Sequence, residues 1–344
     1  MPTVYTRREA LARLAAASLA LSARGVSARQ APPSPHRIDI HQHFVSPKFL
    51  ATLTARNAAT LGAWRDYSPS RAIGAMDRAG IATAMISVTT PGIWFGNAEE
   101  TRGIARELNE YGAEKMVGDY KGRFGLFAVL PLPNVENSLQ EIAYAFDVLK
   151  ADGIGMLTGY DDKWLGDPAF APVFEELNRR RAIVYVHPVD AACCPGNIPG
   201  VTPQMLEYPT NTTRTIASLL VTGAASRYSQ VRFVFAHGGG TITSLAGRMT
   251  GPGGRADMFS KPAEPDSRLF HLRRFYYDTA FAANPVTMQA LKTLASTSQI
   301  IFGTDSPFGN GAASVEQLMN CGLSSEELRA VERENAAKLL PKYA

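Results

Sequence analysis

The chain has 344 residues, of which 45% are hydrophobic and 19% are charged, which is typical of a globular protein with a buried core. The formal net charge of +4 arises within residues 1–30, where five arginines oppose one glutamate (5 − 1 = +4), so the remaining chain is neutral (4 − 4 = 0). A neutral body argues against nucleic acid as a partner, because phosphate binding needs clustered Lys and Arg.

Residues 1–28 are expected to be an export signal. Arg7 and Arg8 precede a short, weakly apolar stretch that ends in the small-x-small tripeptide 26–28. Paired arginines before a mild apolar region are typical of a Tat signal, and the stretch is too short to span a bilayer. We therefore expect a periplasmic or exported protein without a membrane span, the alternative being an amphipathic helix at the start of a cytoplasmic protein. Residues 29–36 are predicted to form a Pro-rich spacer.

Eight short apolar segments, many rich in β-branched residues, are predicted strands. In chain order they are residues 37–43, 81–90, 123–132, 153–160, 182–188, 231–240, 274–280 and 300–308. Stretches with helical periodicity lie between them, among them residues 98–120, 137–153, 167–182 and 284–296. The second of these helices is expected to end with Gly153 as its C-cap.

This alternation predicts the fold class. Near-continuous apolar strands separated by amphipathic helices indicate parallel β-structure buried on both faces. Eight such units fit an α/β fold of the (β/α)8 TIM-barrel type, with one domain over residues 37–344. A doubly wound sheet is the alternative, but no Gly-x-Gly-x-x-Gly follows the first strand, so a dinucleotide site has no support. The long segment 189–210, after the fifth strand, is expected to form a wall of the pocket.

Polar side chains gather where the predicted strands end. His41 and His43 end the first strand and share one face of it, because residues i and i+2 of a strand point the same way. His187 ends the fifth strand, His237 the sixth and Asp305 the eighth. Each of these residues alone could be structural, but the carboxyl ends of barrel strands meet at one rim. Three or more imidazoles with a carboxylate on one rim predict a metal site.

Two further aspartates are expected to support that site. Asp39 has the parity of the two histidines of the first strand but lies deeper, which suits a structural role. Asp278 ends the seventh strand and is expected to orient a metal ligand.

The motifs DIHQHF, VHP, AHGGG, YYDTA and GTDSPF occur in the order seen in the amidohydrolase superfamily. They most resemble its branch around α-amino-β-carboxymuconate-ε-semialdehyde decarboxylase, over about residues 37–340. Within this branch, residues 187–214 resemble a loop of 6-methylsalicylate decarboxylase-like proteins.

The resemblance implies one divalent metal ion, zinc or manganese, held by His41, His43, His187 and Asp305. It makes His237 the catalytic histidine and gives Asp305 a second role as a proton shuttle. The fourth predicted strand holds no lysine to bridge two metals, which argues against dinuclear hydrolases. The branch also implies a homodimer.

The expected function is a metal-dependent carboxy-lyase acting on a small hydroxybenzoate-like carboxylic acid. The same residues would serve a hydrolase of a lactone or amide if the metal activated water, and a catalytically silent binding protein is a third possibility. For substrate contacts we expect the rings of Phe44, Trp94, Tyr208 and Phe308, with packing as their alternative role. Arg214 is expected to pair with a carboxylate, or else to lie on a helix surface.

Overall fold

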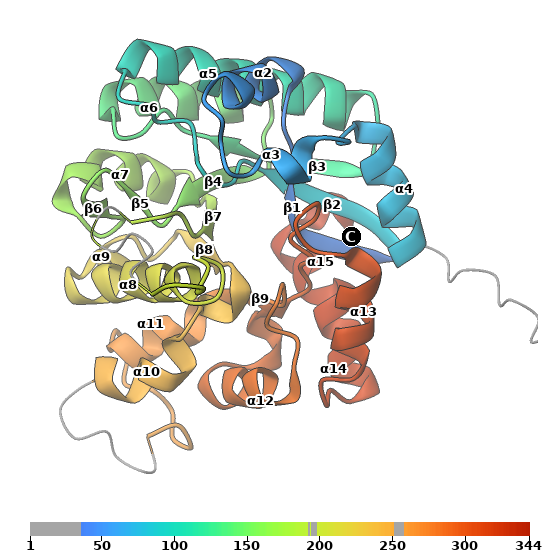
Figure 1. Ribbon diagram of the computed structural model, residues 1–344. Helices are drawn as coiled ribbons and strands as arrows, with labels where there is room; N and C mark the ends of the chain where they lie inside the picture. The colour runs from blue at the N-terminus through green and yellow to red at the C-terminus, as the bar shows by residue number, and fades with distance from the viewer. Residues whose placement is uncertain (1–35, 192, 194–197, 251–257) are drawn as a thin grey trace, which may run out of the picture. The chain divides into compact units, whose positions relative to one another are not determined.

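The computed structural model describes residues 36–191, 193, 198–250 and 258–344. In this part of the chain, eight parallel strands pair in the order β1-β2-β3-β4-β7-β8-β9-β10, and helices surround them (Figure 1). The strands are β1 (Arg37–His43), β2 (Ile81–Ser87), β3 (Phe124–Val129), β4 (Gly153–Leu157), β7 (Ile183–His187), β8 (Arg232–Phe235), β9 (Tyr276–Asp278) and β10 (Ile300–Ile301). The predicted (β/α)8 barrel is confirmed, and each of the eight predicted segments contains one of its strands.

The barrel closes where its last strand meets its first. The ladder here is short, since β10 has two residues and the contact with β1 is an isolated bridge between Gln42 and Ser306. The backbone N–H of His43 donates to Ser306 O at 2.8 Å, and that of Asp305 donates to His41 O at 2.8 Å. We call this junction the closing seam. It places the polar ends of β1 and of the segment after β10 side by side.

Helices cover the outside of the barrel. The α-helices are α2 (Pro47–Ala55), α3 (Leu61–Trp64), α4 (Pro69–Ala79), α5 (Ala98–Tyr111), α6 (Val135–Ala143), α7 (Ala171–Arg179), α8 (Glu207–Val221), α9 (Ala224–Arg227), α10 (Ile242–Met249), α11 (Arg268–Arg274), α12 (Pro285–Leu294), α13 (Gly311–Met319), α14 (Ser325–Arg329) and α15 (Asn335–Leu339). The π-helical segments are η1 (Gly112–Gly118), η2 (Tyr144–Val148) and η6 (Ala330–Glu334). The 3-10 turns are η3 (Pro168–Phe170), η4 (His237–Gly239), η5 (Thr297–Gln299) and η7 (Pro341–Tyr343), and β5 (Gly159–Tyr160) pairs antiparallel with β6 (Lys163–Trp164).

Local sequence signals set many helix starts. Asn284, for example, caps α12 by accepting the backbone N–H of Thr287 at 3.0 Å, and Pro285 occupies the first turn. One predicted helix end is wrong, because Gly153 begins β4. The chain turns earlier, at Lys150 with φ of 59°, and the carboxylate of Asp152 then accepts the backbone N–H of Leu126 at 2.9 Å.

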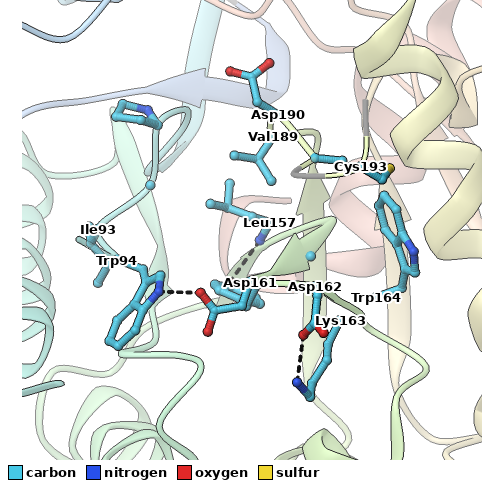
Figure 2. Close-up of a pocket in the computed structure, with 15 residues that line it drawn as sticks. Ile93, Trp94, Leu157, Asp161, Asp162, Lys163, Trp164, Val189, Asp190 and Cys193 are labelled. Atoms are coloured by element: carbon cyan, nitrogen blue, oxygen red, sulfur yellow. Dashed lines mark hydrogen bonds and ion pairs between the residues drawn. The ribbon is translucent and has the colours of Figure 1, made fainter. Parts of the chain in front are cut away.

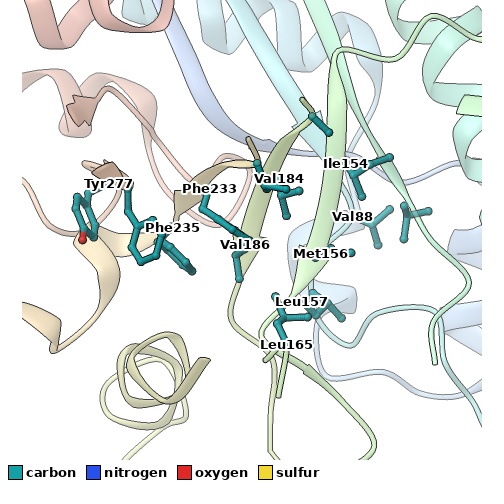
Figure 3. Packing of buried hydrophobic residues seen from close by; sticks show 14 of the residues in the cluster. Val88, Ile154, Met156, Leu157, Leu165, Val184, Val186, Phe233, Phe235 and Tyr277 are labelled. Atoms are coloured by element: carbon teal, nitrogen blue, oxygen red, sulfur yellow. The ribbon is translucent and has the colours of Figure 1, made fainter. Parts of the chain in front are cut away.

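Two hydrophobic clusters hold these layers together. The larger one lies between strands and helices, and Figure 3 shows part of it, including Phe233 and Phe235 of β8. The alternate residue of that strand, Val234, belongs to the second cluster with Tyr185 and Leu339. Alternation along the strand therefore separates the two layers, as expected for a barrel with a filled interior.

The predicted export signal over residues 1–28 lies outside the described residues, as does the spacer apart from His36, so the cellular location stays a prediction. The expected homodimer also stays a prediction. None of the helices in the described part of the chain combines the length and the apolar character that crossing a bilayer requires.

Candidate active site

Four side chains at the carboxyl ends of the strands converge on one point. One ligand atom from each of His41, His43, His187 and Asp305 lies within 4.8 Å of the others, and all four residues are buried. The Nε2 atoms of His41 and His43 are 3.0 Å apart, and they lie 3.1 Å and 2.9 Å from Asp305 Oδ1. These residues come from β1, from the end of β7 and from the closing seam.

Hydrogen bonds on the far side of each ring fix the orientation of the histidines. His41 Nδ1 donates to Asp278 Oδ2 at 2.8 Å, His43 Nδ1 to Ser87 O at 3.2 Å and His187 Nδ1 to Pro188 O at 2.8 Å. With the proton on Nδ1, each Nε2 presents a lone pair toward the centre. This is the arrangement that metal-binding histidines require.

The electrostatics of the site suit a cation. Burial and the neighbouring His43 hold the pKa of His187 well below its usual value, so its imidazole is neutral. Burial alone would raise the pKa of Asp305, but His41 and His43 hold it well below its usual value, so the carboxylate is ionised. Against the effect of burial, Asp278 and Asp305 raise the pKa of His41 to about 10. A positive charge is therefore favoured at this point, and a divalent ion would compete with a proton for it.

Two buried polar atoms of this group lack partners that a metal ion would supply. His187 Nε2 is buried and has no hydrogen-bond partner among the described residues. The same holds for Asp305 Oδ1 when the Nε2 atoms of His41 and His43, 3.1 Å and 2.9 Å away, carry no proton. Buried polar atoms are rarely left without a partner, because the lost hydrogen bond costs about 1–3 kcal/mol. A divalent ion about 2.0–2.2 Å from imidazole nitrogens and a carboxylate oxygen would satisfy both atoms. The residues present fit a single divalent metal.

Asp278 holds the site together from behind. Its Oδ2 accepts the Nδ1–H of His41 and, at 3.0 Å, the hydroxyl of Tyr185. Its Oδ1 accepts the backbone N–H groups of His237 at 2.9 Å and Ala280 at 3.0 Å. These contacts agree with the expectation that Asp278 orients a metal ligand. Asp278 also positions His237 through its backbone N–H.

Asp39 lies below the ligands, as expected from its place in the strand. It accepts the backbone N–H groups of His41 and Thr304 at 3.0 Å each, and the Thr304 hydroxyl at 2.6 Å. Gly303 is needed beside it, since a Cβ there would lie 2.9 Å from the Cβ of His41. Asp39 therefore ties β1 to the segment that carries Asp305.

His237 lies beside the predicted metal ligands and is set apart from them. Its Nδ1 donates to Ala280 O at 3.1 Å, and its Nε2 lies 3.9 Å from Asp305 Oδ2. Burial lowers the pKa of His237. His237 and Asp305 both have left-handed backbones, with φ of 56° and 59°, a strained conformation that is concentrated at functional sites. The geometry leaves Nε2 of His237 free to exchange a proton in the cavity.

A cavity of about 600 Å³ opens over this group. His187, His237 and Asp305 form its floor. Its other lining residues, none of which carries a charge, are Thr60, Thr89, Thr90, Gln204, Met205, Tyr208, Pro209, Gly240, Phe281, Ala282, Thr287 and Phe308. The expected contribution of the segment 189–210 agrees with the positions of Gln204, Met205, Tyr208 and Pro209.

Two of the predicted substrate contacts line the cavity. The Phe308 ring lies 5.9 Å from that of His43, centroid to centroid, and is 38% exposed. Burial raises the pKa of Tyr208 to about 12, so its phenol remains a neutral hydrogen-bond donor.

Three expected contacts lie elsewhere. Phe44 is packed in the core against Tyr111, because it follows His43 and therefore points to the opposite side of the strand. The Arg214 guanidinium binds Asn211 Oδ1 at 2.6 Å on its own helix. Trp94 lines a neighbouring cavity. The expectation that these side chains contact the substrate beside the metal is not supported by their positions.

The sequence interpretation missed several lining residues, of which Phe281 is the most informative. Its ring lies 5.9 Å from that of His237, and its side chain is 65% exposed. The sequence did contain an indication of this role, since Phe281 lies three residues after Asp278, in a loop at the carboxyl end of a strand. Thr89 and Thr90 lie two and three residues after the end of β2, so their position at the carboxyl end of a strand was the same indication.

Comparisons with known proteins agree with this geometry. The family model described as amidohydrolase matches residues 38–342. The chain belongs to the amidohydrolase family. The decarboxylase yanB of Aspergillus niger is 33% identical over 327 residues, which cover 89% of this chain and 88% of that protein. A 6-methylsalicylic acid decarboxylase of Aspergillus aculeatus is 33% identical over 293 residues, covering 79% and 84%.

The fold of this amidohydrolase is also found in solved structures. A dihydroxybenzoic acid decarboxylase of Polaromonas with bound manganese and an inhibitor superposes with a TM-score of 0.78 at 18% sequence identity, covering 90% of this chain and 98% of that one. The resemblance drawn from the strand-end motifs is confirmed.

Replacement of Asp278 by asparagine is expected to lower the metal affinity of this amidohydrolase about 10- to 100-fold, because the amide no longer holds the Nδ1–H of His41 with a charged acceptor. Metal titration of the purified variant measures this. The matched control is Asp266→Asn, which alters an Asp–His pair with His271 at 2.9 Å on α11, outside the cavity. Equal metal affinity in the two variants would show that Asp278 does not support the ligands.

Proposed function

We propose that this amidohydrolase is a metal-dependent carboxy-lyase that removes CO2 from a hydroxybenzoate-like aromatic acid. The observation that carries the proposal is the 33% identity, over most of both chains, to enzymes named as decarboxylases. The cavity supports it, since aromatic side chains and hydroxyl groups line its walls, and among the described residues that line it Asp305 alone carries a carboxylate.

The ligand set gives the cofactor its place in the reaction. A divalent ion held by the three histidines and Asp305 would stabilise the negative charge that develops on a substrate oxygen. Imidazole and carboxylate ligands suit manganese and zinc. We propose manganese first, because the Polaromonas enzyme of the same fold carries it.

Two side chains of this chain are placed to move protons. Asp305 turns Oδ1 toward His41 and His43 and Oδ2 toward His237. Oδ1 would therefore bind the metal, which leaves Oδ2 to exchange a proton with the substrate ring. His237 Nε2, 3.9 Å from Oδ2, would accept a proton in the cavity, and with that proton in place it would hold the departing carboxylate or resupply the proton. The Tyr208 phenol would donate a hydrogen bond to the acid, and the Phe308 ring would pack against the substrate ring.

The first experiment is a direct assay of the metal-loaded chain. We expect CO2 release from salicylate-type acids, including 6-methylsalicylate, and we expect a chelator to abolish the activity and added Mn²⁺ to restore it. CO2 and ester cleavage are followed in parallel, with aryl lactones as the competing substrates. Lactone cleavage without CO2 release would replace the proposal with a hydrolase in which His237 accepts a proton from water.

A further inference from the structure

A second cavity, of about 470 Å³, lies at the carboxyl ends of β2, β4 and β7. Its apolar surface comes from Ile93, Leu157 and Tyr160, which are 2%, 8% and 6% exposed. Figure 2 shows Trp94 and Trp164 on opposite sides of the view with Leu157 between them. Apolar walls and two indole rings suit a flat, uncharged aromatic molecule.

A hydrogen bond orients the indole of Trp94, and a cation–π contact lies over that of Trp164. The indole N–H of Trp94 donates to Asp161 Oδ1 at 2.6 Å. The guanidinium of Arg214 lies 6.0 Å from the centroid of the Trp164 ring. Rings that are already oriented lose less conformational entropy when a ligand packs against them.

The charged groups around this cavity are mainly acidic. Asp161, Asp162 and Asp190 line it together with Lys163, whose Nζ pairs with Asp162 Oδ1 at 2.8 Å. The carboxylates of Asp161 and Asp190 therefore exceed the positive charge among the described lining residues. Partial burial and the nearby Glu207 raise the pKa of Asp190, as expected where negative charges gather. An aromatic carboxylate entering this cavity would be repelled.

A thin wall separates the two cavities. After β2, Thr90 lines the metal cavity and the next residue, Pro91, lines the second cavity. After β7, His187 lines the metal cavity and Val189 lines the second. The hydroxyl of Thr90 donates to Pro188 O at 3.1 Å and joins the two sides. A molecule released at the metal therefore has the second cavity as its immediate neighbour.

We propose that the second cavity binds the neutral phenol formed by decarboxylation, and that its carboxylates exclude the aromatic acid. The inference rests on the proposed function, in which the C–CO2 bond breaks, a proton takes its place on the ring and CO2 leaves. The substrate is an anion at neutral pH, whereas the phenol, with a pKa near 10, is uncharged. The loss of charge thus distinguishes product from substrate, and the second cavity is a product site.

Intrinsic fluorescence tests this binding without turnover. The chain has three tryptophans, of which Trp94 and Trp164 line the second cavity. The ring of Trp64 lies 5.2 Å from that of Phe308 in the metal cavity, so the test uses the Trp64→Phe chain, in which only the two tryptophans of the second cavity report. The probes are 3-methylphenol and 3-methylbenzoate, which have similar shape and differ in charge at pH 7. We expect saturable quenching of the metal-loaded chain by the phenol, and no quenching by the benzoate at the same concentrations.

Two variants make the test specific. Trp164→Ala is expected to weaken binding of 3-methylphenol about three- to tenfold, as for loss of one aromatic contact. Asp190→Asn is expected to let 3-methylbenzoate quench the fluorescence, a gain that misfolding cannot imitate. Unsaturable phenol quenching, equal affinity for both probes in the unaltered chain, or no gain in Asp190→Asn would each overturn the proposal. Absence of CO2 release in the separate assay would contradict the proposed function and leave the binding result intact.

Discussion

Replacement of His237 by alanine is expected to lower kcat/KM by at least about 100-fold, the smaller end of the range for a positioned acid–base group. Its Nε2 faces Asp305 Oδ2 across 3.9 Å in the cavity, and Nδ1 is already bonded to Ala280 O. Only one ring nitrogen is therefore available for a proton transfer, and alanine removes it. Stoichiometric metal should remain, because His237 is not one of the four proposed ligands.

Metal analysis and steady-state assay of the same preparation check this result. The matched control is His36→Ala, which removes a half-exposed imidazole near Glu332 at the other end of the barrel and should retain full activity. Turnover of His237→Ala at the rate of the unaltered chain would remove His237 from the mechanism. Loss of metal from that variant would instead make His237 a ligand.

Replacement of His187 by alanine is expected to abolish both metal binding and activity. Loss of a supporting group behind a metal ligand costs about 10- to 100-fold in affinity, and loss of the ligand itself should exceed this. His187 is the only proposed ligand from β7, on the far side of the site from the closing seam. Without His187, all remaining ligands come from the closing seam, and the ion has no protein ligand on the opposite side.

Metal analysis after dialysis and thermal unfolding with and without MnCl2 both measure metal binding, and the CO2-release assay measures activity. A ligand at 100 times its dissociation constant stabilises a protein by about 2.7 kcal/mol, so the unaltered chain should unfold at a higher temperature when Mn²⁺ is added. His187→Ala should show no such shift. A variant that keeps both the shift and the metal would rule out His187 as a ligand. Comparison of His187→Ala with His237→Ala distinguishes a residue that binds the metal from one that acts on the substrate beside it.

The barrel and its polar rim could be predicted because both depend on local patterns. A strand that is buried on both faces is apolar along its length, so each polar side chain at its end stands out. His187 and His237 were visible for that reason, and the parity of His41 and His43 placed them together. The same argument, applied to Phe44, would have placed it outside the barrel, where the structure has it, and not among the substrate contacts that we expected.

The walls of the cavity depend on how loops from distant parts of the chain meet. Arg214 bonds to Asn211 within its own helix, and the sequence offers no sign that this contact replaces one to a ligand. Phe281 lies beside His237 because Asp278 and Ala280 hold the loop there through hydrogen bonds. The contact of Arg214 is between residues three apart on one helix, which periodicity allows, but periodicity does not show that it replaces a contact with a ligand. The place of Phe281 does not follow from periodicity, since only the folded loops bring it to His237.

The closing seam determines when, during synthesis of the chain, the metal site becomes complete. Asp305 lies 262 residues beyond His43, the nearer of the two histidines of β1 in the sequence, and reaches them only when the barrel has closed. A ribosome-bound chain that has not yet released its last quarter already has its histidines but lacks their carboxylate partner. Metal capture would then come late in biosynthesis, as the final event that locks the first strand of the chain to the last.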